Sequence, residues 1–150
     1  MIKYIITDPC YILPDNIWSE CCKSLDDGFE VFNQAVSKAL TEFTGHKAWA
    51  CDTGYGDWTN EIYGSGVTKH NFYADSGMVC VCRLTASVLE YWQEEYDTTN
   101  LAGAAFFEMS EDIDVKFDTS NIHWTVVKVR DNQTGDTIQS TTEEEYEEED

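Results

Sequence analysis

Apolar residues recur along this chain at two spacings, one typical of helices and the other typical of strands. Steps of three and four residues run through 14–25, 27–44 and 87–96, and these three segments are predicted to be helices. In the first, the side chains expected to face inward are Ile17, Trp18, Cys21 and Leu25. In the third, they are Val88, Leu89, Trp92 and Tyr96.

The clearest of these helices is 27–44. Its apolar side chains, which we expect to face the core, are Phe29, Phe32, Val36, Leu40 and Phe43. Asp27 and Glu30 have the spacing of a capping box at its start. Gly45 follows directly and is a typical residue for a helix end. Both ends of this helix are therefore predicted from single residues.

Short apolar or alternating runs predict the strands. These are 2–7, 49–51, 78–84, 104–109, 113–118, 122–130 and 136–141. The run 78–84 is apolar at nearly every position, as expected of a central strand with both faces buried. In 113–118 apolar and charged residues alternate, so one face of that strand should be exposed. The segment 131–135 suits a hairpin loop between the last two strands.

This succession predicts an α+β domain over residues 1–142. We expect a mostly antiparallel sheet with two or three helices packed on one face. The segment 143–150 follows it and consists of seven acidic residues and one tyrosine. Such a run of like charges cannot pack, so a disordered acidic C-terminal tail is predicted.

Acidic residues outnumber basic ones throughout the chain. The sequence has 29 Asp and Glu against nine Lys and Arg, a net charge of −20. Seven of the acids lie in the tail, and the other 22 still exceed the nine bases. A surface this negative repels nucleic acid and anionic membranes and attracts basic partners. We therefore expect a basic protein partner, without direct binding to nucleic acid or to a membrane.

Neither a membrane span nor a metal site is expected. The chain has no run of about 18 apolar residues, and Asp8-Pro9 interrupts its first apolar stretch before a signal-peptide core could form. The six cysteines include no C-x-x-C pair, and the three histidines show no ligand spacing. We expect reduced thiols, no metal, no cofactor and a cytosolic protein.

The acids also fall on faces of regular elements that should be exposed. Glu90 and Glu94 would lie on the outer face of the third helix, and Asp112 and Asp114 on or beside the strand 113–118. Duplex DNA presents one negative charge per ~1.7 Å of its axis, and carboxylates on an ordered scaffold can imitate that spacing. Mimicry of nucleic acid is one interpretation of this acidity, and plain solubility is the other.

In its composition and its Glu-rich C-terminus, Glu143–Asp150, the chain resembles phage anti-restriction and anti-CRISPR DNA-mimic proteins. Those proteins are small, cytosolic and strongly acidic. The resemblance implies a non-enzymatic phage inhibitor that acts in the host cytoplasm. Its partner would be a basic nucleic-acid-binding protein or ribonucleoprotein of the host, either a CRISPR effector or a restriction complex, whose basic groove it would occupy.

Three short segments carry a second resemblance. They are Asp8-Pro9-Cys10-Tyr11, Asp52-Thr53-Gly54-Tyr55-Gly56-Asp57 and Asp75-Ser76-Gly77. They are similar to segments of an uncharacterised family of small phage and bacterial proteins, over roughly residues 4–84. The resemblance implies a shared β-rich fold and no known activity. Trp58 departs from it, since a glycine would be expected after Asp57.

The function predicted first is therefore inhibition by occupation of a basic groove. The residues predicted to bind the partner are the aromatic anchors Tyr55, Trp58 and Tyr63 and the carboxylates of Glu90, Glu94, Asp112 and Asp114. No catalytic residue is predicted, and the chain is not expected to be an enzyme.

Two other functions stay open. One is a small-ligand-binding or enzymatic domain centred on the Gly- and aromatic-rich loops 49–77, where oxygen and imidazole groups could also converge on a divalent cation. Its candidate residues are Asp52, Asp57, Glu61, His70 and Asp75. The other is a virion assembly protein, for which the acidity would be incidental.

Overall fold

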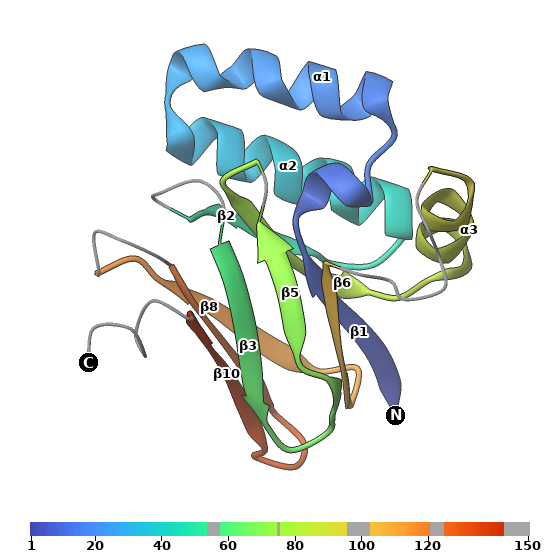
Figure 1. Cartoon of the computed structure of the whole chain (residues 1–150), viewed down its shortest axis with the longest axis vertical. Helices are drawn as coiled ribbons and strands as arrows, with labels where there is room; N and C mark the ends of the chain where they lie inside the picture. The colour runs from blue at the N-terminus through green and yellow to red at the C-terminus, as the bar shows by residue number, and fades with distance from the viewer. Residues whose placement is uncertain (54–57, 75, 96–102, 121–124, 143–150) are drawn as a thin grey trace.

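The fold is seen in a computed structural model of the chain, which describes residues 1–53, 58–74, 76–95, 103–120 and 125–142 (Figure 1). The helices are α1 (Asp15–Lys23), α2 (Phe29–Thr44) and α3 (Ala86–Glu95), and short 3-10 turns are η1 (Pro9–Tyr11) and η2 (Ser24–Asp27). The strands are β1 (Ile2–Thr7), β2 (Trp49–Asp52), β3 (Trp58–Gly64), β4 (Val67–Lys69), β5 (Asn71–Ala74), β6 (Met78–Arg83), β7 (Ala104–Met109), β8 (Ile113–Asp118), β9 (Val126–Asp131) and β10 (Thr137–Thr142). The predicted acidic tail, 143–150, lies outside the described residues.

The strands form two five-stranded antiparallel sheets. The inner sheet has the order β2-β6-β1-β7-β4, and the outer sheet has the order β5-β3-β10-β9-β8. The predicted α+β class, with antiparallel strands and helices packed on one face, is confirmed. The division of the strands into two sheets is a feature that the hydrophobic pattern did not indicate.

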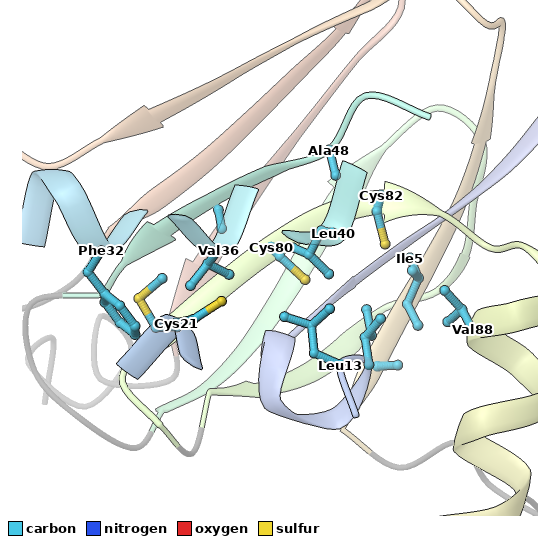
Figure 2. Packing of buried hydrophobic residues seen from close by; sticks show 14 of the residues in the cluster. Ile5, Leu13, Cys21, Phe32, Val36, Leu40, Ala48, Cys80, Cys82 and Val88 are labelled. Carbon is cyan, nitrogen blue, oxygen red and sulfur yellow. The ribbon is translucent and has the colours of Figure 1, made fainter. Parts of the chain in front are cut away.

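One core lies between the helices and the inner sheet. Figure 2 shows Phe32, Val36 and Leu40 of α2 beside Cys80 and Cys82 of β6, all of them buried in one cluster. The alternate residues 80 and 82 point to the same face of β6, which is why both thiols enter this core. The cysteines there serve as small apolar side chains.

The two sheets enclose a second core. Tyr4, Val81 and Phe107 from the inner sheet pack there with Val129 and Ile138 from the outer sheet. The rings of Tyr4 and Phe107 stack with centroids 5.1 Å apart. Because the inner sheet has a core on each side, its central strands are buried on both faces, as predicted for 78–84.

The start of α2 differs from the prediction. Asp27 belongs to η2, and the residue before α2 is Gly28. The φ of Gly28, 102°, is not helical, so η2 and α2 are separate segments. No side chain caps the helix, so the predicted capping box is wrong. The predicted end is confirmed, because Gly45 has a φ of 77° and its N–H bonds to the carbonyl of Thr41.

Two side chains expected in the core are instead exposed. Leu25 and Phe29, at the turn between α1 and α2, have 42% and 61% of their surface accessible. Helical spacing placed both on the inward face, and the structure contradicts this. A spacing pattern identifies one face of a helix, but it does not say how far along the helix the sheet extends.

A buried carboxylate organises the loop between β9 and β10. The side chain of Asp131 accepts hydrogen bonds from Ser110 and from the backbone N–H groups of Gln133 and Thr134. The bonds from Ser110 are the main reason that the pKa of Asp131 lies well below its usual range. The predicted hairpin is thus confirmed, and its loop is tied to the residue that follows β7.

No helix in the described part of the chain is long and apolar enough to span a bilayer.

Candidate functional site

A groove of about 500 Å³ lies on the outward face of the outer sheet. Its lining comes from β3, β8, β9 and β10 and consists of Tyr63, Gly64, Asp114, Lys116, Lys128, Val129, Arg130, Thr137, Ile138 and Gln139. Every second residue of these strands points into the core between the sheets, so the residues between them are left to form the groove. We define this set of residues as the outer groove.

Strand register aligns the polar side chains of the outer groove in rows. Tyr63 pairs with Gln139, Gln139 with Lys128, and Lys128 with Lys116, so one row crosses four strands. In the next row, Arg130 of β9 stands opposite Asp114 of β8. Side chains that are directly opposite in antiparallel strands lie close enough to interact.

The row contains an unfavourable charge pair. Lys116 and Lys128 are directly opposite each other and both exposed, and like charges in such a position destabilise a sheet. The ammonium of Lys128 lies 3.3 Å from the carboxylate of Asp118. Hydrogen bonds from Ser120, with a smaller contribution from Lys128, lower the pKa of Asp118 to about 2.

Three of the nine basic residues of this acidic chain line the outer groove, against one lining carboxylate, Asp114. The outer groove is therefore locally basic on a protein whose net charge is −20. A groove with this lining can hold an anionic group between Lys116, Lys128 and Arg130.

One end of the outer groove is formed by an aromatic residue. Tyr63 has 44% of its surface exposed, and its hydroxyl donates a hydrogen bond to Glu61. Its ring centroid lies 6.0 Å from that of His70, whose Nδ1 is 2.8 Å from the carbonyl oxygen of Ile62. Tyr63 thus contacts Glu61 and His70, which lies between β4 and β5, and also lines the groove.

The structure brings together some of the residues predicted to bind a partner. Tyr63 and Asp114 line the outer groove, and the exposed Asp112 immediately precedes β8. The carboxylate of Asp112 accepts a hydrogen bond of 3.0 Å from Asn132. Glu90 is exposed on α3, which belongs to the helical layer on the other side of the inner sheet (Figure 1). The predicted carboxylates therefore do not form a single row.

The side chains of the remaining predicted residues lie outside the described part of the structure. Tyr55 lies outside the described residues. Trp58 begins β3 and Glu94 belongs to α3, but the side chains of both lie outside the described part of the structure. Their roles in binding stay predictions.

The basic side chains of the outer groove were missed by sequence reasoning, which selected acids and aromatics. A signal was present, because Lys116 alternates with apolar residues in 113–118, and Lys128 and Arg130 do the same in 126–131. Only the register between the two strands places these lysines opposite each other.

Residues of the short segments that resemble an uncharacterised family meet at one end of the inner sheet. Asp8 is fully buried and accepts hydrogen bonds from Cys10 N–H at 2.9 Å and from the hydroxyl and N–H of Ser76. The N–H of Thr53 donates to the carbonyl of Gly77 at 2.8 Å. Burial is the main reason that the pKa of Asp8 is raised. Asp8 thus connects the turn that follows β1 with the loop that precedes β6 through hydrogen bonds.

The cation site considered from the sequence is not assembled by its described members. Asp52 accepts a bond of 2.8 Å from Asn33 of α2, while Glu61 and His70 have the separate partners given above. Asp57 and Asp75 lie outside the described residues. Among the residues that can be described, no three His, Cys, Asp or Glu side chains are placed to share a metal ion.

Cys51, which lies in β2 at the start of the segment 49–77, is also a poor nucleophile. Burial is the main cause that raises the pKa of Cys51 to about 12, so the unreactive protonated thiol predominates at neutral pH. Hydrogen bonds involving Thr125 and the backbone of Asp52 lower this pKa, but burial and the nearby Asp52 carboxylate outweigh them, so the thiol is not activated as in catalytic cysteines.

Comparison with known proteins gives no relative: no protein-family model, curated protein or solved structure matches this chain.

Proposed function

We propose that this protein is a non-enzymatic inhibitor, of the kind made by phages, that occupies the basic groove of a nucleic-acid-binding defence enzyme in the host cytoplasm. A CRISPR effector or a restriction complex is the target class. The observation that carries the proposal is that, within the described part of the chain, only one exposed carboxylate, that of Glu20, makes an ion pair.

Twelve acidic side chains in the described part of the structure are exposed. They are Asp15, Glu20, Asp26, Asp27, Glu30, Glu42, Glu90, Glu108, Glu111, Asp112, Asp114 and Asp136. Of these, only Glu20 makes an ion pair with another described residue, Lys23, at 2.7 Å. Surface acids that serve stability are commonly placed near bases, whereas these remain available to a partner.

The most suitable contact surface is the turn between α1 and α2. Asp26 and Asp27 of η2 and Glu30 of α2 are exposed there beside the accessible side chains of Leu25 and Phe29. We call these five residues the acidic corner. Protein interfaces combine an apolar centre with charged residues around it, and an exposed phenylalanine is a good central anchor. A partner that fits this surface has cationic side chains around an apolar depression.

The proposal is tested by affinity capture from a bacterial lysate with the immobilised full chain. We expect recovery of a nucleic-acid-binding protein at low salt, with reduced recovery at about 0.5 M NaCl, because the Debye length falls toward ~4 Å there. Added duplex DNA should displace the same protein, because both ligands would occupy one basic groove.

A variant of the full chain with Asp26→Asn, Asp27→Asn and Glu30→Gln is used in the same capture experiment. The proteins that it captures are identified by mass spectrometry. Recovery of the partner should fall with this variant. The proposal is contradicted if the captured protein is retained in the presence of excess DNA, or if every captured protein is retained equally at low and high salt.

A further inference from the structure

We propose that the outer groove is a binding site for an extended carboxylate-rich peptide, and that the segment which occupies it is this chain's own C-terminus, 143–150. The inference does not depend on the proposed function, since it concerns a contact within the protein. It rests on the lining of the groove, on the place where the described chain ends, and on charge complementarity.

The lining provides three cations without enough anions to balance them. Lys116 and Lys128 face each other across β8 and β9, and Arg130 lies in the next row. The acids nearest in register are Asp114, opposite Arg130, and Asp118, which lies 3.3 Å from Lys128. A further carboxylate between the two lysines would relieve their repulsion and accept charge-assisted hydrogen bonds from both.

The last described strand ends beside the groove. β10 lies between β3 and β9 in the outer sheet and ends at Thr142, three residues after the groove residue Gln139. At ~3.4 Å per residue, Gln139 and Thr142 are ~10 Å apart along β10. Neighbouring strands are ~4.8 Å apart, so Lys128 lies ~4.8 Å and Lys116 ~10 Å to the side of β10. Eight residues reach at most ~28 Å when extended. A chain that reverses direction after Thr142 can therefore cross both lysines.

The charge of the segment 143–150 restricts the surfaces to which it can bind. The segment 143–150 has seven carboxylates, and the rest of the chain has 22 acids against nine bases, so most of the surface repels it. The outer groove holds three of those nine bases. Attachment to β10 also gives the segment an effective concentration near the millimolar range, which allows weak ion pairs to keep it bound.

The test is zero-length carbodiimide cross-linking of the full chain, which joins a carboxylate to an amine only when the two are in contact, followed by peptide mass spectrometry. We expect cross-links from 143–150 to Lys116 and Lys128 in the monomer. The ion pair between Lys23 and Glu20, 2.7 Å apart, provides an internal reference for reactivity.

A variant that keeps both reactive lysines makes the test specific. Arg130→Gln should lower the yield of these cross-links by about twofold to fivefold relative to the reference, because one of three ion-pairing groups is lost. Lys38→Gln, which removes the same charge from an exposed position on α2, should leave the yield unchanged.

Three results would overturn the inference. The first is the absence of cross-links to Lys116 and Lys128 while the reference pair forms. The second is an equal yield to exposed lysines elsewhere, such as Lys38 and Lys47. The third concerns a mixture of normal and nitrogen-15-labelled protein. If the cross-links there join labelled to unlabelled chains, the segment that occupies the groove belongs to a second copy of the protein.

Discussion

Replacing Gly64 by alanine is expected to lower the free energy of unfolding by about 3 kcal/mol, because the new methyl group has no space. Gly64 ends β3 with a φ of +141°, a conformation that side-chain-bearing residues rarely adopt. A Cβ there would overlap the carbonyl oxygen of Thr137 and lie 2.8 Å from the Cα of Ile138. Both neighbours are backbone atoms of β10, so they cannot rotate away. Urea denaturation measures the loss.

Gly135→Ala is the matched control for this prediction. Gly135 also has a positive φ, +80°, but no atom lies within 4 Å of the position of its Cβ. Only the backbone conformation is then penalised, by about 1 kcal/mol. Equal losses in the two variants would contradict the close contact between β3 and β10 that forms the floor of the outer groove.

The second large effect is expected from Asp8→Ala, with a loss of about 3 kcal/mol. The buried carboxylate of Asp8 satisfies the N–H groups of Cys10 and Ser76, and its removal leaves these donors without that acceptor. The loops that follow β1 and precede β6 then lose their connection. Glu42→Ala, which removes an exposed carboxylate from α2, should change stability by less than about 0.5 kcal/mol.

The effect of Asp8→Ala should also depend on pH. Burial raises the pKa of Asp8 above its ordinary value of 3.8, so folding favours the protonated form. The stability that this shift contributes is complete below pH 3.8 and is lost as the pH rises through the pKa of the folded state. The difference between wild type and variant should therefore decrease between pH 4 and pH 7. An increase over that range would mean that hydrogen bonds to the ionised form outweigh its burial.

The segments that form regular structure could be predicted well from the sequence. β1, β6, β7 and the hairpin of β9 and β10 follow from apolar runs and alternation, which report burial on one or both faces. The division into two sheets could not be predicted, because a strand's own pattern does not identify its neighbours. β3, β4 and β5 were also missed, because the segment between Asp52 and Met78 was interpreted as loops. β4 and β5 are too short for a period to be seen, and in β3 the buried position 60 is an asparagine, which hides the alternation.

The candidate site was predicted only in part. Tyr63 and Asp114 were chosen as an anchor and a carboxylate, and both line the outer groove. The cations beside them depend on the pairing of Lys116 with Lys128, a long-range property of the sheet. Phe29 was misplaced because periodicity assigns it to a face of α2 and says nothing of what covers the first turn.

The most direct test of the account is the salt dependence of affinity for the captured partner, measured by calorimetry with the purified full chain. The account predicts that the dissociation constant rises steeply with NaCl. It also predicts a rise of about tenfold for the variant with Asp26→Asn, Asp27→Asn and Glu30→Gln. A charge-matched variant with Asp15→Asn, Glu42→Gln and Asp136→Asn, all exposed positions outside the predicted contact residues, should have a smaller effect. A dissociation constant that changes with neither salt nor these substitutions would contradict binding through surface carboxylates.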